Sequence, residues 1–135
     1  MGNFLDTLVE AYPNVPFQKL LGIEIVCVRT DQVTIKIPFR NELIGGGSAL
    51  HGGVMSSLLD LTGAMAAWSG HDPSRGMKAS TVSLTINFLS AAIEKDIFAT
   101  GTVRRRGKEL IFCDVNITDN DGKDIASGSM IYRIV

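Results

Sequence analysis

This chain of 135 residues has few cysteines and almost no net charge, which argues against a disulfide-rich protein, a cysteine metal site and a nucleic-acid-binding protein. The two cysteines, Cys27 and Cys113, lie far apart with no CxxC spacing and no adjacent histidine. The sequence therefore predicts two reduced thiols rather than a disulfide framework or a metal site. The formal net charge is −1, which gives no electrostatic reason to expect a nucleic-acid partner.

The distribution of apolar and charged residues also predicts neither a secretion signal nor a membrane-spanning helix. Residues Met1 to Asp6 contain no basic stretch followed by an apolar run, so we expect a cytoplasmic protein. The longest apolar segment, Leu50 to Trp68, is barely long enough to cross a bilayer and carries Asp60 at its centre. This segment is therefore predicted to be a buried helix of a globular protein, with no membrane partner.

Composition and periodicity predict one α+β domain over residues 1–135. Apolar residues make up 45% of the chain and charged residues 20%, which is typical of a globular domain. Helical spacing predicts an N-terminal helical segment at residues 1–21. A central helix that is apolar nearly all round needs a sheet wrapped about it. The predicted strands are residues 23–28, 33–38, 79–90, 97–104, 110–118 and 125–135.

The central helix, predicted from His51 to Ser69, opens on His51-Gly52-Gly53, and from Gly52 onward Asp60 is its one ionisable residue. A helix start presents backbone N–H groups that stabilise negative charge. A carboxylate in an apolar helix is costly unless it is paired or used. Together they indicate a functional site. A face of small or polar residues is expected to meet a second subunit or a ligand rather than the core: Ser56, Ser57, Asp60, Gly63 and Ala67.

These residues resemble a known family by their spacing. His51-Gly52-Gly53, Asp60 nine residues after the histidine, the strand from Thr81 to Leu89 and the turn Arg106-Gly107-Lys108 are similar to the hotdog-fold acyl-CoA thioesterases of the phenylacetyl-CoA type. The resemblance covers the chain after Leu21. It implies a long helix wrapped by a curved antiparallel sheet. It also implies subunits paired edge to edge as a homodimer or a dimer-of-dimers tetramer, with active sites at the dimer interface.

The resemblance also implies roles for four residues. Asp60 matches a carboxylate that acts either as a general base for water or as a nucleophile on the thioester carbonyl. Gly53 matches the residue whose N–H polarises that carbonyl. His51 is either an acid–base or positioning group or a structural histidine, and Thr81 falls where relatives hold the attacking water. No metal or redox cofactor is implied, because coenzyme A is part of the substrate.

Coenzyme A brings phosphates, and the turn Arg105-Arg106-Gly107-Lys108 places three cations around a glycine. The resemblance puts this turn and the end of the preceding long strand along the path of the pantetheine and the nucleotide. The acyl pocket is expected to be lined by Met55, Leu59 and strand side chains of the partner subunit. The predicted substrate-binding residues are Gly52, Phe88, Leu89, Ser90, Ala91, Ala92, Arg105, Arg106, Gly107, Lys108 and Arg133.

One part of the family pattern is missing. Several members carry Asn or Gln about six residues before the histidine, where this chain has Gly45-Gly46-Gly47-Ser48, with Asn41 further back. Two other functions therefore stay open. One is a non-catalytic module that binds acyl-CoA. The other is a dehydratase of hydroxyacyl thioesters, in which His51 and Asp60 are the catalytic histidine and its acidic partner.

Overall fold

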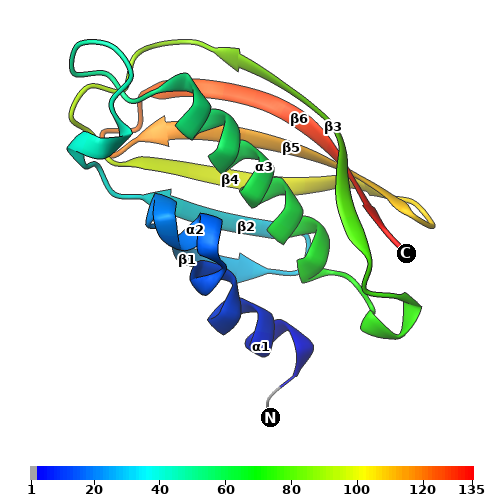
Figure 1. The fold of residues 1–135 in the computed structure, drawn as a ribbon. Helices are drawn as coiled ribbons and strands as arrows, with labels where there is room; N and C mark the ends of the chain where they lie inside the picture. The colour runs from blue at the N-terminus through cyan, green and yellow to red at the C-terminus, as the bar shows by residue number, and fades with distance from the viewer. Residues whose placement is uncertain (1–2) are drawn as a thin grey trace.

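The computed structural model describes residues 3–135, so Met1 and Gly2 of the predicted N-terminal segment lie outside the described residues. Figure 1 shows one long helix, α3 (Gly52–Ser69), lying across a curved antiparallel sheet. This arrangement confirms the predicted α+β architecture. The six strands, in their spatial order, are β1 (Glu24–Arg29), β2 (Gln32–Ile37), β4 (Ile97–Arg106), β5 (Leu110–Asp119), β6 (Asp124–Ile134) and β3 (Ala79–Phe88).

The N-terminal segment consists of α1 (Phe4–Ala11), the short turn η1 (Tyr12–Asn14) and α2 (Pro16–Leu21), as its apolar spacing and prolines predict. The side chain of Asn3 caps α1 by accepting the Asp6 N–H at 2.9 Å. The buried Tyr12 hydroxyl donates to the carbonyl oxygen of Leu61 in α3 at 2.8 Å. This hydrogen bond fixes the segment against the middle of α3, one residue beyond Asp60.

Helix α3 ends at Ser69, as predicted. Gly70 has a φ of −110°, so it does not adopt the left-handed conformation that often ends a helix. The carboxylate of Asp31 accepts from Arg106 at 2.7 Å, and this ion pair packs over the end of α3. A Cβ at position 70 would overlap the ends of both side chains, so a larger residue here would displace this ion pair.

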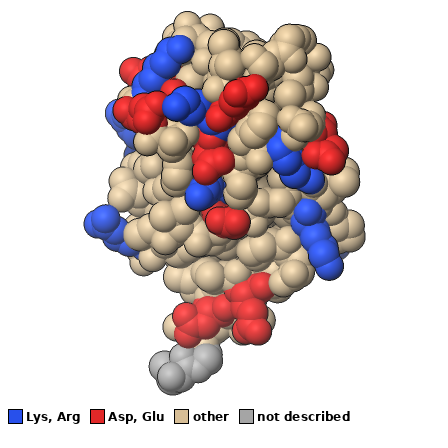
Figure 2. Space-filling model, turned by 90° about the vertical axis from the view of Figure 1, so that its left-hand side faces the viewer, with Lys and Arg blue, Asp and Glu red and all other residues tan. Residues whose placement is uncertain are grey.

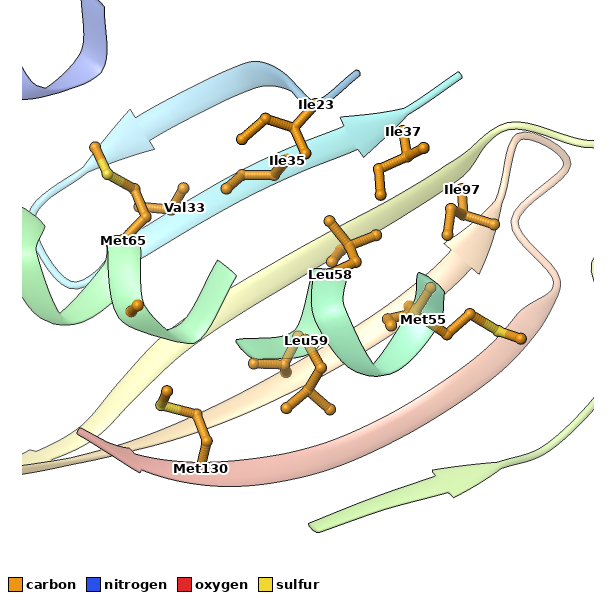
Figure 3. Close-up of a cluster of buried hydrophobic side chains, with 14 of the residues drawn as sticks. Ile23, Val33, Ile35, Ile37, Met55, Leu58, Leu59, Met65, Ile97 and Met130 are labelled. Carbon is orange, nitrogen blue, oxygen red and sulfur yellow. The ribbon is translucent and has the colours of Figure 1, made fainter. Parts of the chain in front are cut away.

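The hydrophobic core lies between α3 and the concave face of the sheet (Figure 3). Alternate residues of β2, namely Val33, Ile35 and Ile37, face α3 and are fully buried, as the period of a half-buried strand predicts. Met55 and Leu59 are also part of this core, with exposed fractions of 5% and 0%. The expectation that these two residues line an acyl pocket is therefore wrong.

The small-residue face of α3 is divided between surface and core. Ser56, Ser57 and Asp60 are half-buried, whereas Gly63 and Ala67 are buried. A Cβ on Gly63 would lie 2.5 Å from Cγ of Met130, so this glycine lets α3 approach β6. The prediction that the whole face meets a partner or a ligand is wrong for its C-terminal part. Its accessible part is the stretch that ends at Asp60.

Strand β3 lies at one edge of the sheet and is exposed along almost its whole length. Among residues 3–135 it pairs with β6 alone, and its apolar side chains Val82, Leu84 and Phe88 are exposed. An uncovered apolar edge of this kind is suited to pairing with a strand of another chain.

The surface carries charges of both signs. On the face that Figure 2 shows, Lys and Arg side chains lie among Asp and Glu side chains, with no large field of one sign. Cys27 is exposed and Cys113 is buried, and both are free. None of the helices within residues 3–135 combines the length and the hydropathy that a bilayer span requires.

Candidate active site

His51 organises the start of α3. Its Nδ1 accepts the Gly53 N–H at 2.8 Å, and its carbonyl oxygen accepts the N–H groups of Val54 and Met55. His51 therefore caps the helix, which is the structural role that the sequence left open beside a chemical one. The Gly53 N–H, the predicted donor to the thioester carbonyl, is occupied by the imidazole. A substrate oxygen gains this donor only by replacing Nδ1.

Asp60 and Thr81 lie together. Oδ1 of Asp60 accepts the Thr81 hydroxyl of β3 at 2.6 Å. Asp60 is half-buried, and because seven residues make about two helical turns, it lies on the same face of α3 as Gly53. The structure thus joins two residues that the sequence singled out separately, and their roles in catalysis stay predictions.

Two tyrosines near Asp60 were missed by the sequence analysis. Tyr132 is the cross-strand neighbour of Thr81, and its hydroxyl accepts Nε1–H of Trp68 at 3.2 Å. Burial raises the pKa of Tyr132. The hydrogen bond from Trp68 opposes this increase and the Asp60 charge adds to it, so that the pKa is raised overall. Burial also raises the pKa of Tyr12, and the charges of Tyr132 and Asp60 raise it further. Both phenols therefore stay uncharged at neutral pH. Only the pairing of β3 with β6 reveals this neighbourhood.

The loop before α3 is closely packed where several family members carry an amide. The residue six positions before His51 is Gly45, and a Cβ there would lie 3.0 Å from Cα of His51 and 3.2 Å from its ring Cδ2. The Gly45 N–H donates to the Ala49 carbonyl at 2.9 Å and closes the loop. Asn41 is exposed in the short turn η2 (Asn41–Leu43). The backbone at Gly45 thus packs directly on the imidazole.

The dehydratase hypothesis depends on a pairing that one chain does not form. His51 and Asp60 are nine residues apart, which is about 13 Å along α3. His51 is engaged with Gly53 and Asp60 with Thr81. The histidine and the carboxylate of one chain therefore do not act on one another.

The end of β3 lies against the start of α3. A Cβ on Gly52 would lie 3.4 Å from the ring of Phe88, so this ring packs on the glycine backbone. Leu89 and Ala91, which follow Phe88 along the predicted substrate path, are exposed. Three of the predicted substrate-binding residues, Phe88, Leu89 and Ala91, are thus accessible in the segment that packs beside the helix start.

Two further residues of this stretch are held by the fold. The Ser90 hydroxyl donates to the carbonyl oxygen of Asp124. Ala92 is fully buried, and its carbonyl accepts the Leu50 N–H at 2.9 Å. The prediction that Ala92 lines the substrate path is therefore wrong, because its side chain is part of the core.

The basic turn is shorter than predicted, and fewer of its cations are available to bind phosphate. Strand β4 continues through Arg106, whose guanidinium is engaged with Asp31 at 2.7 Å. Arg133 is similarly engaged with Glu109 at 2.9 Å. Arg105, Gly107 and Lys108 line an open groove of about 460 Å³, which also includes Glu109, Leu110 and Phe112.

The two predicted parts of the coenzyme A path lie at opposite ends of the sheet. Leu110 of β5 pairs with Arg133, and Arg133 pairs with Ser80 near the start of β3. The end of β3 at Phe88 is about 27 Å further along the strand. One chain therefore does not present Phe88 and the basic groove to the same ligand.

Comparisons with known proteins agree with this fold. A model of the thioesterase superfamily matches residues 47–126, a segment that contains Gly53, Asp60 and Thr81. Acyl-coenzyme A thioesterase 13 of Homo sapiens is 31% identical over 83% of this chain and 80% of its own length. Acyl-coenzyme A thioesterase PaaI of Escherichia coli is 29% identical over 85% of this chain and 79% of its own length.

The solved structures agree as well. The structure of Escherichia coli PaaI matches with a TM-score of 0.83 at 26% identity, over 93% of this chain and 88% of that chain. Zebra fish thioesterase superfamily member 2 matches with a TM-score of 0.82 at 27% identity, over 96% of this chain and 94% of that chain. The hotdog fold expected from the resemblance is confirmed, and the chain belongs to the thioesterase superfamily.

Proposed function

We propose that this protein is an acyl-CoA thioesterase, which hydrolyses an acyl-CoA to the free acid and coenzyme A. The observation that carries the proposal is the half-buried carboxylate of Asp60, which accepts the Thr81 hydroxyl on the same helix face as Gly53. A held carboxylate and a helix-start N–H are groups that thioester hydrolysis uses. The human and Escherichia coli relatives, both named acyl-coenzyme A thioesterases, support the same activity.

In the proposed reaction Asp60 acts in one of two ways. As a general base it takes a proton from water, whose oxygen adds to the thioester carbon. As a nucleophile it adds to that carbon itself, and water hydrolyses the resulting anhydride. In both routes the carbonyl oxygen replaces Nδ1 of His51 as the acceptor of the Gly53 N–H, becomes negative and is stabilised by this donor. The C–S bond then breaks, and the sulfur leaves with its electron pair and is protonated to the thiol.

Two copies of the chain are needed in this proposal. Gly53 and Asp60 are seven residues apart, which is about 10 Å along α3. A carbonyl oxygen lies about 3 Å from its N–H donor, and its carbon lies about 3 Å from the attacking atom. The two groups therefore have to lie within about 7 Å of each other. We infer that Gly53 of one subunit and Asp60 of a second act on one thioester.

The exposed edge of β3 supports this pairing. Antiparallel pairing of two copies through β3 would continue the sheet across both subunits. It would bring the Phe88 end of one copy beside the Ala79 end of the other, which lies near the groove of Arg105 and Lys108. The two parts of the predicted coenzyme A path would then meet. The proposed assembly is a homodimer, or a tetramer made of two such dimers.

The direct test is release of free thiol from acetyl-, octanoyl- and phenylacetyl-CoA by the whole protein. Asp60→Asn is expected to lower kcat by about a hundredfold to ten-thousandfold, because it removes the general base or the nucleophile. Asp114→Asn is the matched control, since Asp114 is an exposed carboxylate paired with Arg104 on β4.

Three results would contradict parts of this proposal. Unchanged turnover in Asp60→Asn would remove Asp60 from the mechanism. Tight binding of acyl-CoA without thiol release would favour the binding module. Enoyl absorbance from a 3-hydroxyacyl-CoA would favour the dehydratase.

No metal or redox group takes part in the proposed reaction, because a carboxylate activates the water or attacks directly, and an N–H group stabilises the oxyanion. Dialysis against EDTA is therefore expected to leave the rate of thiol release unchanged. A loss of activity that added Mg²⁺ or Zn²⁺ restores would contradict this part of the proposal.

A further inference from the structure

An apolar cavity of about 270 Å³ opens directly beside Gly53, and none of the roles above uses it. The start of α3 forms one side of it, through His51, Gly53 and Ser57. The other sides come from α2 and from the segment around η2. The cavity is therefore bordered by the residue whose N–H is proposed to hold the thioester carbonyl. Its apolar lining consists of Phe17, Leu21, Leu43, Ile44 and Val54.

A thioester substrate extends from its carbonyl in two directions, the acyl arm and the coenzyme A arm, and the residues that line this cavity suit only one of them. The coenzyme A arm is long and ends in phosphates, which are recognised by cations. The cavity has no Lys or Arg in its described lining, and it carries the carboxylate of Glu42. In the proposed dimer, the groove of Arg105 and Lys108 that receives the phosphates belongs to the second copy and lies beside Phe88. The coenzyme A arm therefore runs past Phe88, which is not part of the cavity lining, and the acyl arm is left to enter the cavity.

The size of the cavity agrees with this choice. At about 270 Å³ it lies just below the usual range of pockets that hold drug-sized ligands, so it suits an acyl group rather than the whole of coenzyme A. The Phe17 side chain is 49% exposed, which leaves apolar surface for an acyl group to cover. A carboxylate at the far end of an acyl chain would meet the like charge of Glu42.

We propose that this cavity binds the acyl group of the substrate, with Phe17 as a specificity-determining residue, and that it selects uncharged apolar acyl groups. The inference rests on the proposed thioesterase function, because that function places the thioester carbonyl at Gly53. It replaces the expectation that Met55 and Leu59 line the acyl pocket.

The first experiment compares Phe17→Ala with Leu20→Ala. Leu20 lies on the same helix, is 67% exposed and is not part of the cavity lining, so it is a matched control. Phe17→Ala is expected to lower the ratio of kcat/KM for octanoyl-CoA over acetyl-CoA by about tenfold, because the acetyl group is too short to reach Phe17. Leu20→Ala is expected to change this ratio by less than about twofold. Equal effects of the two substitutions would overturn the proposal.

A second substitution tests the selection against charge. Glu42→Gln removes the negative charge and keeps the shape of the side chain. It is expected to raise the ratio of kcat/KM for glutaryl-CoA over octanoyl-CoA by about fivefold, since it removes a like-charge repulsion. An unchanged ratio would overturn the assignment of an uncharged substrate class.

Binding of non-hydrolysable thioethers separates this inference from the proposed function. The whole protein is expected to bind S-octyl-CoA about tenfold more tightly than S-ethyl-CoA in a calorimetric titration. Phe17→Ala is expected to lose most of this difference, and Leu20→Ala is expected to keep it. This pattern without thiol release would overturn the thioesterase function alone. Equal affinities for the two thioethers would overturn the acyl cavity, whatever the turnover.

Discussion

Asp60 lies beside a hydroxyl and two uncharged phenols rather than beside a cation. Thr81 donates to its Oδ1 at 2.6 Å, and burial raises the pKa of both Tyr12 and Tyr132. Among the ion pairs of residues 3–135 none involves Asp60. The negative charge of this carboxylate is therefore not neutralised by a neighbouring Lys or Arg, which suits a group that has to take a proton or attack a carbonyl.

Replacing Thr81 by valine removes the hydroxyl donor to Asp60 and keeps the branched shape of the side chain. The hydroxyl holds the Asp60 carboxylate in one position, so Thr81→Val is expected to lower kcat about tenfold through loss of this positioning. Thr81→Ser keeps the donor and is expected to retain most of the activity. Steady-state thiol release measures both variants. An equal loss in both would show that the packing of Thr81, not its hydroxyl, matters.

The two thiols are expected to differ in reactivity. Burial raises the pKa of Cys113 to about 11, with the Arg106 charge opposing this and nearby aspartates adding to it, whereas Cys27 is exposed. Because the thiolate is the reactive form, the native protein at pH 8 is expected to show one fast-reacting thiol with a disulfide reagent. The second is expected to react after denaturation. Two fast-reacting thiols in the native protein would contradict this prediction.

Strands β3 and β6 and helix α3 meet at Gly128. A Cβ at this position would overlap the carbonyl oxygen of Thr85 in β3 and would lie 2.7 Å from Cδ1 of Leu59 in α3. The side-chain hydrogen of glycine thus allows three elements to approach at one point. This approach also brings Thr81, at the other half of β3, within reach of Asp60.

Gly128→Ala is therefore expected to destabilise the protein by about 1–3 kcal/mol, because a backbone oxygen and a core side chain have to move. Gly46→Ala is the control. A Cβ there would meet nothing within 4 Å, so its effect is expected to stay within about 0.5 kcal/mol. Urea denaturation of the two variants measures the difference. Equal midpoints would show that β3 and β6 adjust without cost.

In the proposed dimer each site takes Gly53 from one chain and Asp60 from the other. Gly53→Pro removes the N–H, and with it the capping hydrogen bond to Nδ1 of His51, at a position in the first helical turn. Asp60→Asn removes the base or nucleophile. Each variant alone is expected to be nearly inactive.

Mixing and refolding the two variants together is expected to restore about a quarter of the wild-type activity. About half of the dimers then contain one chain of each kind, and each mixed dimer has one intact site of two. Light scattering on each variant shows whether the dimer is kept. Mixed dimers without recovered thiol release would contradict the shared site.

Periodicity was enough to predict the elements and the α+β architecture, and the resemblance of the motifs to a known family implied the hotdog fold. Helix and strand periods depend on residues a few positions apart, and His51, Gly53 and Asp60 belong to one helix, so their geometry follows from its 3.6-residue turn. The glycines at positions 52 and 53 and the carboxylate of Asp60 could be recognised as candidate site residues because they also belong to this one helix.

The remaining features depend on contacts between residues far apart in the chain, which only the tertiary structure decides. Met55 and Ala92 were wrongly assigned to the substrate because an apolar helix and its neighbouring loop do not show which side the sheet will cover. The Arg106 charge is paired with Asp31 across 75 positions. The proposed acyl cavity likewise joins Phe17 to Gly53 through packing alone. Helix and strand formation depends on hydrogen bonds and burial patterns among residues that are close in sequence. Which residue pairs with a surface charge, and which residues line a cavity, depends on how whole helices and strands pack together.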